Sequence, residues 1–161
     1  MPRQYLSYGD PDGVVLQGAA RQVISGQGAT RQLTTAESGA LCLFDRAAGI
    51  VYTLPDITAA NLGMTFEFAT TVTITSNAAK VITGGTGEFI VGGLVSYIAG
   101  AATTFGSAFN GTTHIAVSSN GTTTGGVIGD RFNMTAISLT QWQIQGLLSG
   151  SGTLATAAST S

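Results

Sequence analysis

Few side chains of this 161-residue chain could carry out chemistry. His114 is the only histidine and Cys42 the only cysteine, which falls short of the His and Cys ligand sets of zinc sites. His114 alternates with Ile115 on an expected strand, a pattern that favours a structural role over a general base. Cys42 lies within an apolar strand pattern, so it can form no disulfide within the chain and is expected to be a small buried hydrophobe.

The acidic and glycine-rich segments do not form a catalytic pattern either. Nothing in the spacing of the sheet-region carboxylates pairs them for acid–base catalysis; they are Asp56, Glu67, Glu88 and Asp130. The stretch at 84–87 follows a strand, as a phosphate loop would, but no Lys-Ser/Thr follows it and another strand comes next. No serine lies in a G-x-S-x-G pattern. The sequence therefore predicts no catalytic residue, no cofactor, no metal ligand and no enzyme.

The middle of the chain reads as consecutive β-strands. Strands are expected at 41–44 and 50–54, joined by a charged, Gly-closed turn of hairpin length. Alternation of apolar and polar residues predicts further strands at 64–69 and 71–75. Their β-branched and aromatic side chains are typical of a sheet.

More strands are expected towards the C-terminus, at 88–91, 94–98, 112–119, 127–137 and 139–148. The first two should pair around Gly92-Gly93, and the Asn-Gly pairs at 110–111 and 120–121 should close hairpins. Many short strands with Gly-rich turns and no amphipathic helix predict an all-β fold, an antiparallel β-sandwich or barrel that is jelly-roll-like.

Three segments are expected. Residues 1–30 lack periodicity and should form an extended N-terminal arm that is either disordered or ordered on a neighbour. Residues 31–148 should form the sandwich or barrel. Residues 149–161 are small, uncharged and rich in Gly, Ser and Thr, which predicts a flexible tail.

Charged residues are scarce and unevenly placed. They make up 9% of the chain, against about 25% in an average globular protein, and only Asp130 and Arg131 follow Glu88. A free monomer usually spreads charge over its surface. The pattern therefore favours a surface covered by copies of the chain or by a partner, although hydroxyl groups alone could keep such a β-protein in solution.

Two classes of partner are disfavoured. A net charge of −2 without clustered Lys and Arg does not suit nucleic acid. No apolar run reaches the length of about 20 residues that spans a bilayer, and no signal peptide is expected. Neither nucleic acid nor a membrane is therefore an expected partner.

Several runs resemble small virion proteins of tailed bacteriophages: LTTAESGALCLFDRAAGIVYTLP, NLGMTFEF, TVTITSNAAKVITGG and GDRFNMTAISLTQWQIQGLLSGSGTLAT. Across about residues 33–155 the chain is similar to head decoration (cement) proteins. The resemblance implies a structural protein on the capsid exterior of the virion, made in the host cytoplasm. It also implies binding to the major capsid protein and a homo-oligomer, often a trimer.

Three groups of contact residues follow from these hypotheses. The expected capsid contacts are Arg3, Tyr5, Leu6, Tyr8 and Arg21. The expected subunit-interface residues are Tyr97, Phe105 and Phe109, whose alternative is core packing. A second class of function, a receptor- or carbohydrate-binding module of a phage tail or fibre, would use Trp142 as a stacking platform beside Gln141 and Gln143; core packing is again the alternative for Trp142. A tail-tube subunit is a third reading.

Overall fold

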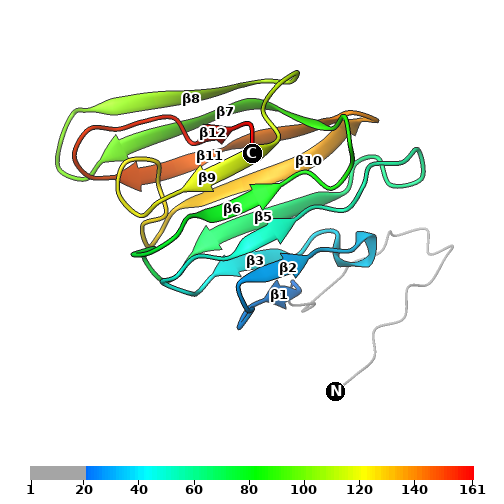
Figure 1. Ribbon diagram of the computed structural model, residues 1–161, viewed down its shortest axis with the longest axis horizontal. Helices are drawn as coiled ribbons and strands as arrows, with labels where there is room; N and C mark the ends of the chain where they lie inside the picture. Colours follow the sequence, from blue (N-terminus) through cyan, green and yellow to red (C-terminus); the bar gives the residue numbers. More distant parts are fainter. Residues whose placement is uncertain (1–20) are drawn as a thin grey trace, which may run out of the picture.

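The computed structural model describes residues 21–161, which form a sandwich of two β-sheets (Figure 1). The strands are β1 (Val23–Ile24), β2 (Thr30–Gln32), β3 (Leu41–Phe44), β4 (Val51–Thr53), β5 (Thr65–Thr70), β6 (Ala79–Ile82), β7 (Phe89–Ile98), β8 (Thr104–Asn110), β9 (Ala116–Ser119), β10 (Arg131–Ser138), β11 (Gln141–Gly150) and β12 (Ala158–Ser159), with a short 3₁₀ helix, η1 (Thr35–Glu37). The larger sheet has the order β1-β3-β5-β10-β11-β7-β8, and the smaller β12-β9-β6-β4-β2. The predicted all-β sandwich is confirmed.

Both sheets are mixed, whereas the sequence predicted antiparallel pairing. In the larger sheet β1, β3 and β5 run parallel, and in the smaller sheet β2, β4 and β6 do the same. The first half of the chain therefore winds as three coils that alternate between the sheets. The turn at 45–49, predicted to close a hairpin, instead carries the chain from β3 to β4 in the opposite sheet.

The two Asn-Gly turns also cross between sheets, so the hairpins predicted there are wrong. The Asn110 side-chain oxygen accepts hydrogen bonds from the N–H groups of Thr112 and Thr113, at 3.1 and 3.0 Å. The Asn120 oxygen accepts from Thr122 and Thr123 in the same way, at 3.0 and 2.9 Å. Such side-chain capping makes a turn on its own, and here the turns leave β8 and β9 towards the other sheet.

Two further strand predictions need correction. The strands predicted at 88–91 and 94–98 do not pair with each other; residues 89–98 form the single strand β7, and Gly92 lies within it with a φ of 122°. A Cβ at Gly92 would lie 2.3 Å from the Ile144 carbonyl oxygen, so only glycine allows this close approach to β11. Residues 71–75 form no strand, because the N–H groups of Thr71 and Val72 both bond to the Phe44 carbonyl as the chain leaves the larger sheet.

The core lies between the sheets and has an aromatic centre. The Phe68 ring stacks on Phe132 at 5.1 Å and on Phe44 at 6.0 Å, and it meets Tyr52 of the smaller sheet at 5.7 Å. Tyr52 is fully buried, and its hydroxyl donates to the Leu43 carbonyl at 2.8 Å. The alternation that predicted the strands thus supplies one buried face from each sheet.

Both ends of the described chain differ from the predicted segments. Residues 151–159 are not loose, because Leu154 and Ala157 are buried and β12 pairs with β9. The small side chains of this segment let its backbone lie close to the sandwich, and the Ala157 N–H donates to the Ser107 hydroxyl at 3.0 Å. At the other end β1 lies inside the predicted arm of residues 1–30 and already belongs to the larger sheet.

A buried carboxylate joins the loop before β10 to the end of β11. One Asp130 oxygen accepts from the N–H groups of Gly126 and Val127, at 2.7 and 3.2 Å. The other accepts from the Ser149 N–H and hydroxyl, both at 2.6 Å. Burial raises the pKa of Asp130, and the hydrogen bonds oppose this effect. Asp130 therefore has a structural role.

Replacing Asp130 by Asn should destabilise the fold by about 1–3 kcal/mol, because the amide nitrogen must face N–H donors on one side and leaves them unsatisfied. Urea denaturation measures this loss. Asp45→Asn is the matched control, since Asp45 also accepts from a backbone N–H, that of Gly26, but at an exposed site. An equal effect of both substitutions would contradict the role given to Asp130.

Candidate functional site

The residues singled out for chemistry lie apart in the structure. Within residues 21–161, no three His, Cys, Asp or Glu side chains are close enough to hold a metal ion. The His114 ring meets Phe109 edge-to-face at 5.7 Å, and its Nδ1 accepts from the Asn110 N–H at 3.2 Å. His114 thus fixes the turn that follows β8, in keeping with the structural role predicted for it.

Cys42 is fully buried, as predicted. Burial raises the pKa of its thiol to about 12, and the nearby Glu37 carboxylate adds to the effect. Because the thiolate is the reactive form, a thiol with this pKa is a poor nucleophile near neutral pH.

The carbohydrate platform predicted at Trp142 is wrong. Trp142 is fully buried, and its indole N–H donates to Glu88 at 3.0 Å inside the sandwich. Its ring lies 6.2 Å from that of Phe66. Gln141 and Gln143 alternate with Trp142 along β11 and therefore point to the opposite side of the sheet. No sugar could reach the indole while the fold is intact.

The predicted subunit-interface residues are divided between two surfaces. Phe109 is 3% exposed and belongs to the core, so its assignment to an interface is wrong. Phe105 is half-buried on the inner side of β8, and Tyr97 is 42% exposed on the outer side of β7. Of the predicted capsid contacts, Arg3, Tyr5, Leu6 and Tyr8 lie outside the described residues, and only Arg21 can be placed.

The best candidate for a functional surface is the face of the larger sheet that points away from the smaller sheet, here called the outer face. Leu147 of β11 is 58% exposed and lies directly opposite Val95 of β7, which is 46% exposed. Tyr97 follows on the same side of β7. A groove of about 670 Å³ runs along this face, lined by Tyr97 and Leu147 at one side and by Glu67 and Arg131 at the other.

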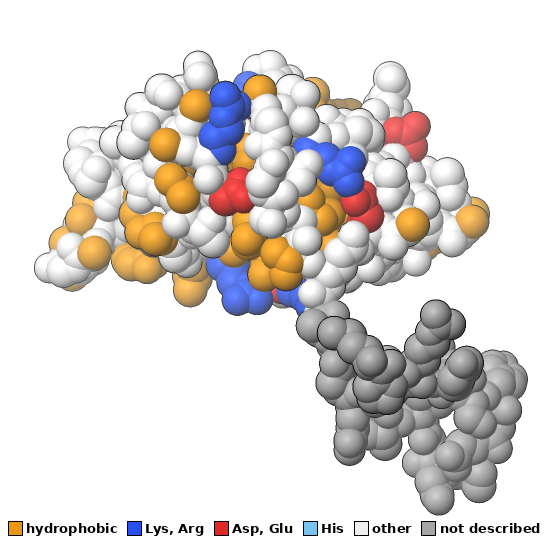
Figure 2. Space-filling view, turned by 90° about the horizontal axis from the view of Figure 1, so that it is seen from below, with side chains coloured by type: hydrophobic (Ala, Val, Ile, Leu, Met, Phe, Trp, Pro, Cys, Tyr) orange, Lys and Arg blue, Asp and Glu red, His pale blue; other side chains and the backbone are white. Residues whose placement is uncertain are grey.

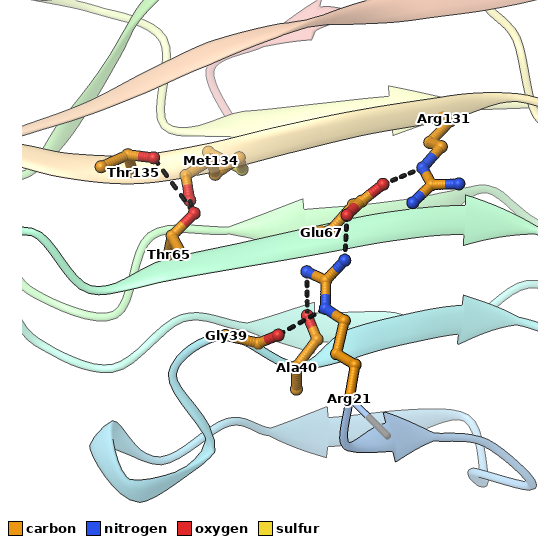
Figure 3. A network of polar contacts seen from close by, with 8 residues as sticks. All are labelled: Arg21, Gly39, Ala40, Thr65, Glu67, Arg131, Met134 and Thr135. Carbon is orange, nitrogen blue, oxygen red and sulfur yellow. Dashed lines mark hydrogen bonds and ion pairs between the residues drawn. The ribbon is translucent and has the colours of Figure 1, made fainter. Parts of the chain in front are cut away.

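An ion-pair network crosses the outer face (Figure 3). Glu67 of β5 lies between two guanidinium groups, those of Arg21 and Arg131, and forms an ion pair with each. Arg21 also donates to the carbonyl oxygens of Gly39 and Ala40, the latter at 3.0 Å. The network thus joins β5 and β10 to the chain that enters β1. With one carboxylate and two guanidinium groups, it leaves one positive charge at the rim of the groove.

Exposed hydrophobic side chains are spread between the few charged ones on the surface that Figure 2 shows. Sequence reasoning identified Arg21 and Tyr97 but did not select Glu67, Arg131, Val95 or Leu147. Their outward positions follow from the alternation of each strand. That they form one surface follows only from the strand order, with β5, β10, β11 and β7 as successive neighbours.

No protein family, no curated protein and no solved structure matches this chain. Among residues 21–161, no helix has the length and apolar character needed to cross a membrane.

Replacing Glu67 by Gln should lower the free energy of unfolding by about 1 kcal/mol at low salt, because two partly exposed ion pairs are lost together. The loss should shrink in 1 M NaCl, where such pairs are screened. Urea denaturation at both salt concentrations measures this, with Asp56→Asn as the control that removes one negative charge outside the network. A loss independent of salt would contradict an electrostatic role for Glu67.

The Cys42 thiol should resist alkylation by iodoacetamide at pH 8 in the folded protein. A rise in its pKa from 9.0 to about 12 lowers the thiolate fraction, and thus the rate, by about 10³-fold, before any effect of steric exclusion. Mass spectrometry of native and urea-unfolded samples measures the two rates. Similar rates in both samples would show that Cys42 is accessible.

Proposed function

We propose that this chain is a structural virion protein, without catalytic activity, that binds the outer surface of a bacteriophage capsid and stabilises the shell. The observation that carries the proposal is the outer face, where Leu147, Val95 and Tyr97 are exposed side by side on neighbouring strands. The resemblance of the sequence to head decoration proteins supplies the class of partner, the major capsid protein.

The composition of the outer face supports a protein partner. Tyrosine and arginine are enriched at protein interfaces, where apolar side chains form the centre and polar ones the rim. Here Tyr97 and Leu147 border the groove, and Arg131, whose side chain is 60% exposed, lies at its rim. The extra positive charge of the network would suit carboxylate or carbonyl oxygens on the partner.

A binder of this kind needs no chemical step to strengthen a shell. A protein that binds only the mature shell stabilises it by RT ln(1 + [L]/Kd), which is about 2.7 kcal/mol per site at a hundredfold excess over Kd. Many equivalent sites on one shell would then raise the free energy of opening it.

Leu147→Ser should weaken binding to empty, expanded heads by about tenfold or more, because burying a Leu side chain that is exposed in the free chain contributes about 1.5–3 kcal/mol. Co-sedimentation of the purified chain with heads assembled from the major capsid protein of the same genome measures binding. Calorimetry of those heads should show a higher melting temperature when the wild-type chain is bound.

Leu139→Ser is the matched control. Leu139 is 55% exposed, close to the value for Leu147, but it lies in the turn before β11, about 20 Å along the strand from Leu147. It should bind as the wild type does. If the wild-type chain does not bind the heads, the proposed function is wrong; if both variants bind normally, the outer face is not the contact surface.

A further inference from the structure

Three of the four sheet edges are short, and one is not. The larger sheet ends in β1 and β8, and the smaller in β12 and β2. Strands β1, β2 and β12 have two or three residues each, whereas β8 has seven. In Figure 1, β8 forms the upper border of the molecule. Among residues 21–161, β8 is therefore the one long edge strand.

The β8 edge lacks the features that normally prevent edge-to-edge pairing. Natural edge strands carry Lys, Pro or bulges, or are kept very short. The sequence of β8 is TFGSAFN, and no charged residue lies anywhere between Glu88 and Asp130. Thr104, Gly106, Ala108 and Asn110 are all exposed. The edge is thus open to a further strand.

The hydrogen bonds to β7 show which backbone groups of β8 are free. The Ile98 N–H bonds to the Thr103 carbonyl, and the Gly111 N–H bonds to the Ile90 carbonyl. Because hydrogen-bonded pairs in an antiparallel ladder recur every second residue, Phe105, Ser107 and Phe109 bond to β7. Thr104, Gly106, Ala108 and Asn110 point their N–H and C=O groups away from β7, in the plane of the sheet. The Asn110 N–H is already bonded to His114, which leaves Thr104, Gly106 and Ala108 as donors.

We propose that β8 pairs with β8 of a second copy of this chain, antiparallel and about a twofold axis at Ser107. In this register Gly106 lies opposite the partner's Ala108, and Thr104 opposite the partner's Asn110. All the outward residues therefore face outward residues, so the register is self-complementary, as an isologous dimer requires.

The side chains fit this register. Phe105, which is only half-buried, is in register with the partner's Phe109. Because Phe109 is 3% exposed and stays in the core of its own subunit, it is the exposed part of the Phe105 ring that the partner strand covers. On the outer side the opposing residues are Gly106 and the partner's Ala108, and a Cβ built at Gly106 meets no atom within 4 Å, so nothing obstructs the approach. No like charges oppose one another, since β8 has none. This fit of the strand to itself favours a second copy over a foreign strand.

The dimer is independent of the proposed capsid function, because it uses the edge of β8 and leaves the outer face free. It has twofold symmetry, unlike the trimer implied by the resemblance to decoration proteins.

Ala108→Pro tests the pairing in the full chain. The N–H of Ala108 points away from β7, so proline at this position removes a hydrogen bond to the partner and none to β7. Edge strands tolerate proline at such positions. Light scattering after size exclusion should give twice 16.2 kDa for the wild type. Ala108→Pro should raise the dimer dissociation constant about tenfold or more, since the bond is lost at both symmetry-related positions. Ala108→Thr, which keeps the N–H, should remain a dimer.

Amide hydrogen exchange by NMR gives the second measurement. The amides of Gly106 and Ala108 should be protected in the wild type, and that of Gly106 should exchange fast in Ala108→Pro. The Ser107 and Phe109 amides, bonded to β7, should stay protected in both, which shows that the variant is folded. A monomeric wild type, a trimer, or a dimer with fast-exchanging Gly106 and Ala108 amides would each overturn the proposal.

Discussion

The structure depends on the burial of one face of each sheet against the other. Phe68 is central to this contact, because its ring touches aromatic rings from β3, β4 and β10 and so joins both sheets. Trp142 extends the buried layer along β11, and its N–H is satisfied by Glu88. A buried polar group without a partner would cost 1–3 kcal/mol. The aromatic layer and its polar partners therefore fix which side of each strand faces inward.

A sandwich of only two layers leaves an outer face on each sheet, and the winding of the chain decides what those faces and edges look like. The coils of β1 to β6 begin with the short strands β1 and β2, which are sheet edges and leave little backbone for another strand to pair with. The larger sheet grows on its other side through β10, β11, β7 and β8, and this growth creates both the broad outer face and the long β8 edge. The two surfaces proposed for interaction are thus consequences of one asymmetry in the sheet.

The sequence predicted most strands but few of their partners. Alternation in 64–69 and 139–148 is a local property, and the structure has β5 and β11 there. The turn sequence at 45–49 suits both a hairpin within one sheet and a crossover to the other sheet. The local sequence therefore could not distinguish the two. Trp142 is different, because the glutamines at 141, 143 and 145 already place Trp142 on the apolar side of β11. This alternation was the signal in the sequence that Trp142 is buried.

The scarcity of charge has a specific structural form. The second half of the sequence has two acidic residues, Glu88 and Asp130, and both are buried as hydrogen-bond acceptors. The uncharged stretch from Phe89 to Gly129 contains the whole of β8.

If two β8 edges pair, opposite residues point to the same side of the joined sheet, and both outer faces then face the same direction. Two faces presented together to a repeating surface bind with an avidity above that of either face alone. Edge pairing would therefore strengthen the contact made by the outer face without using any residue of it.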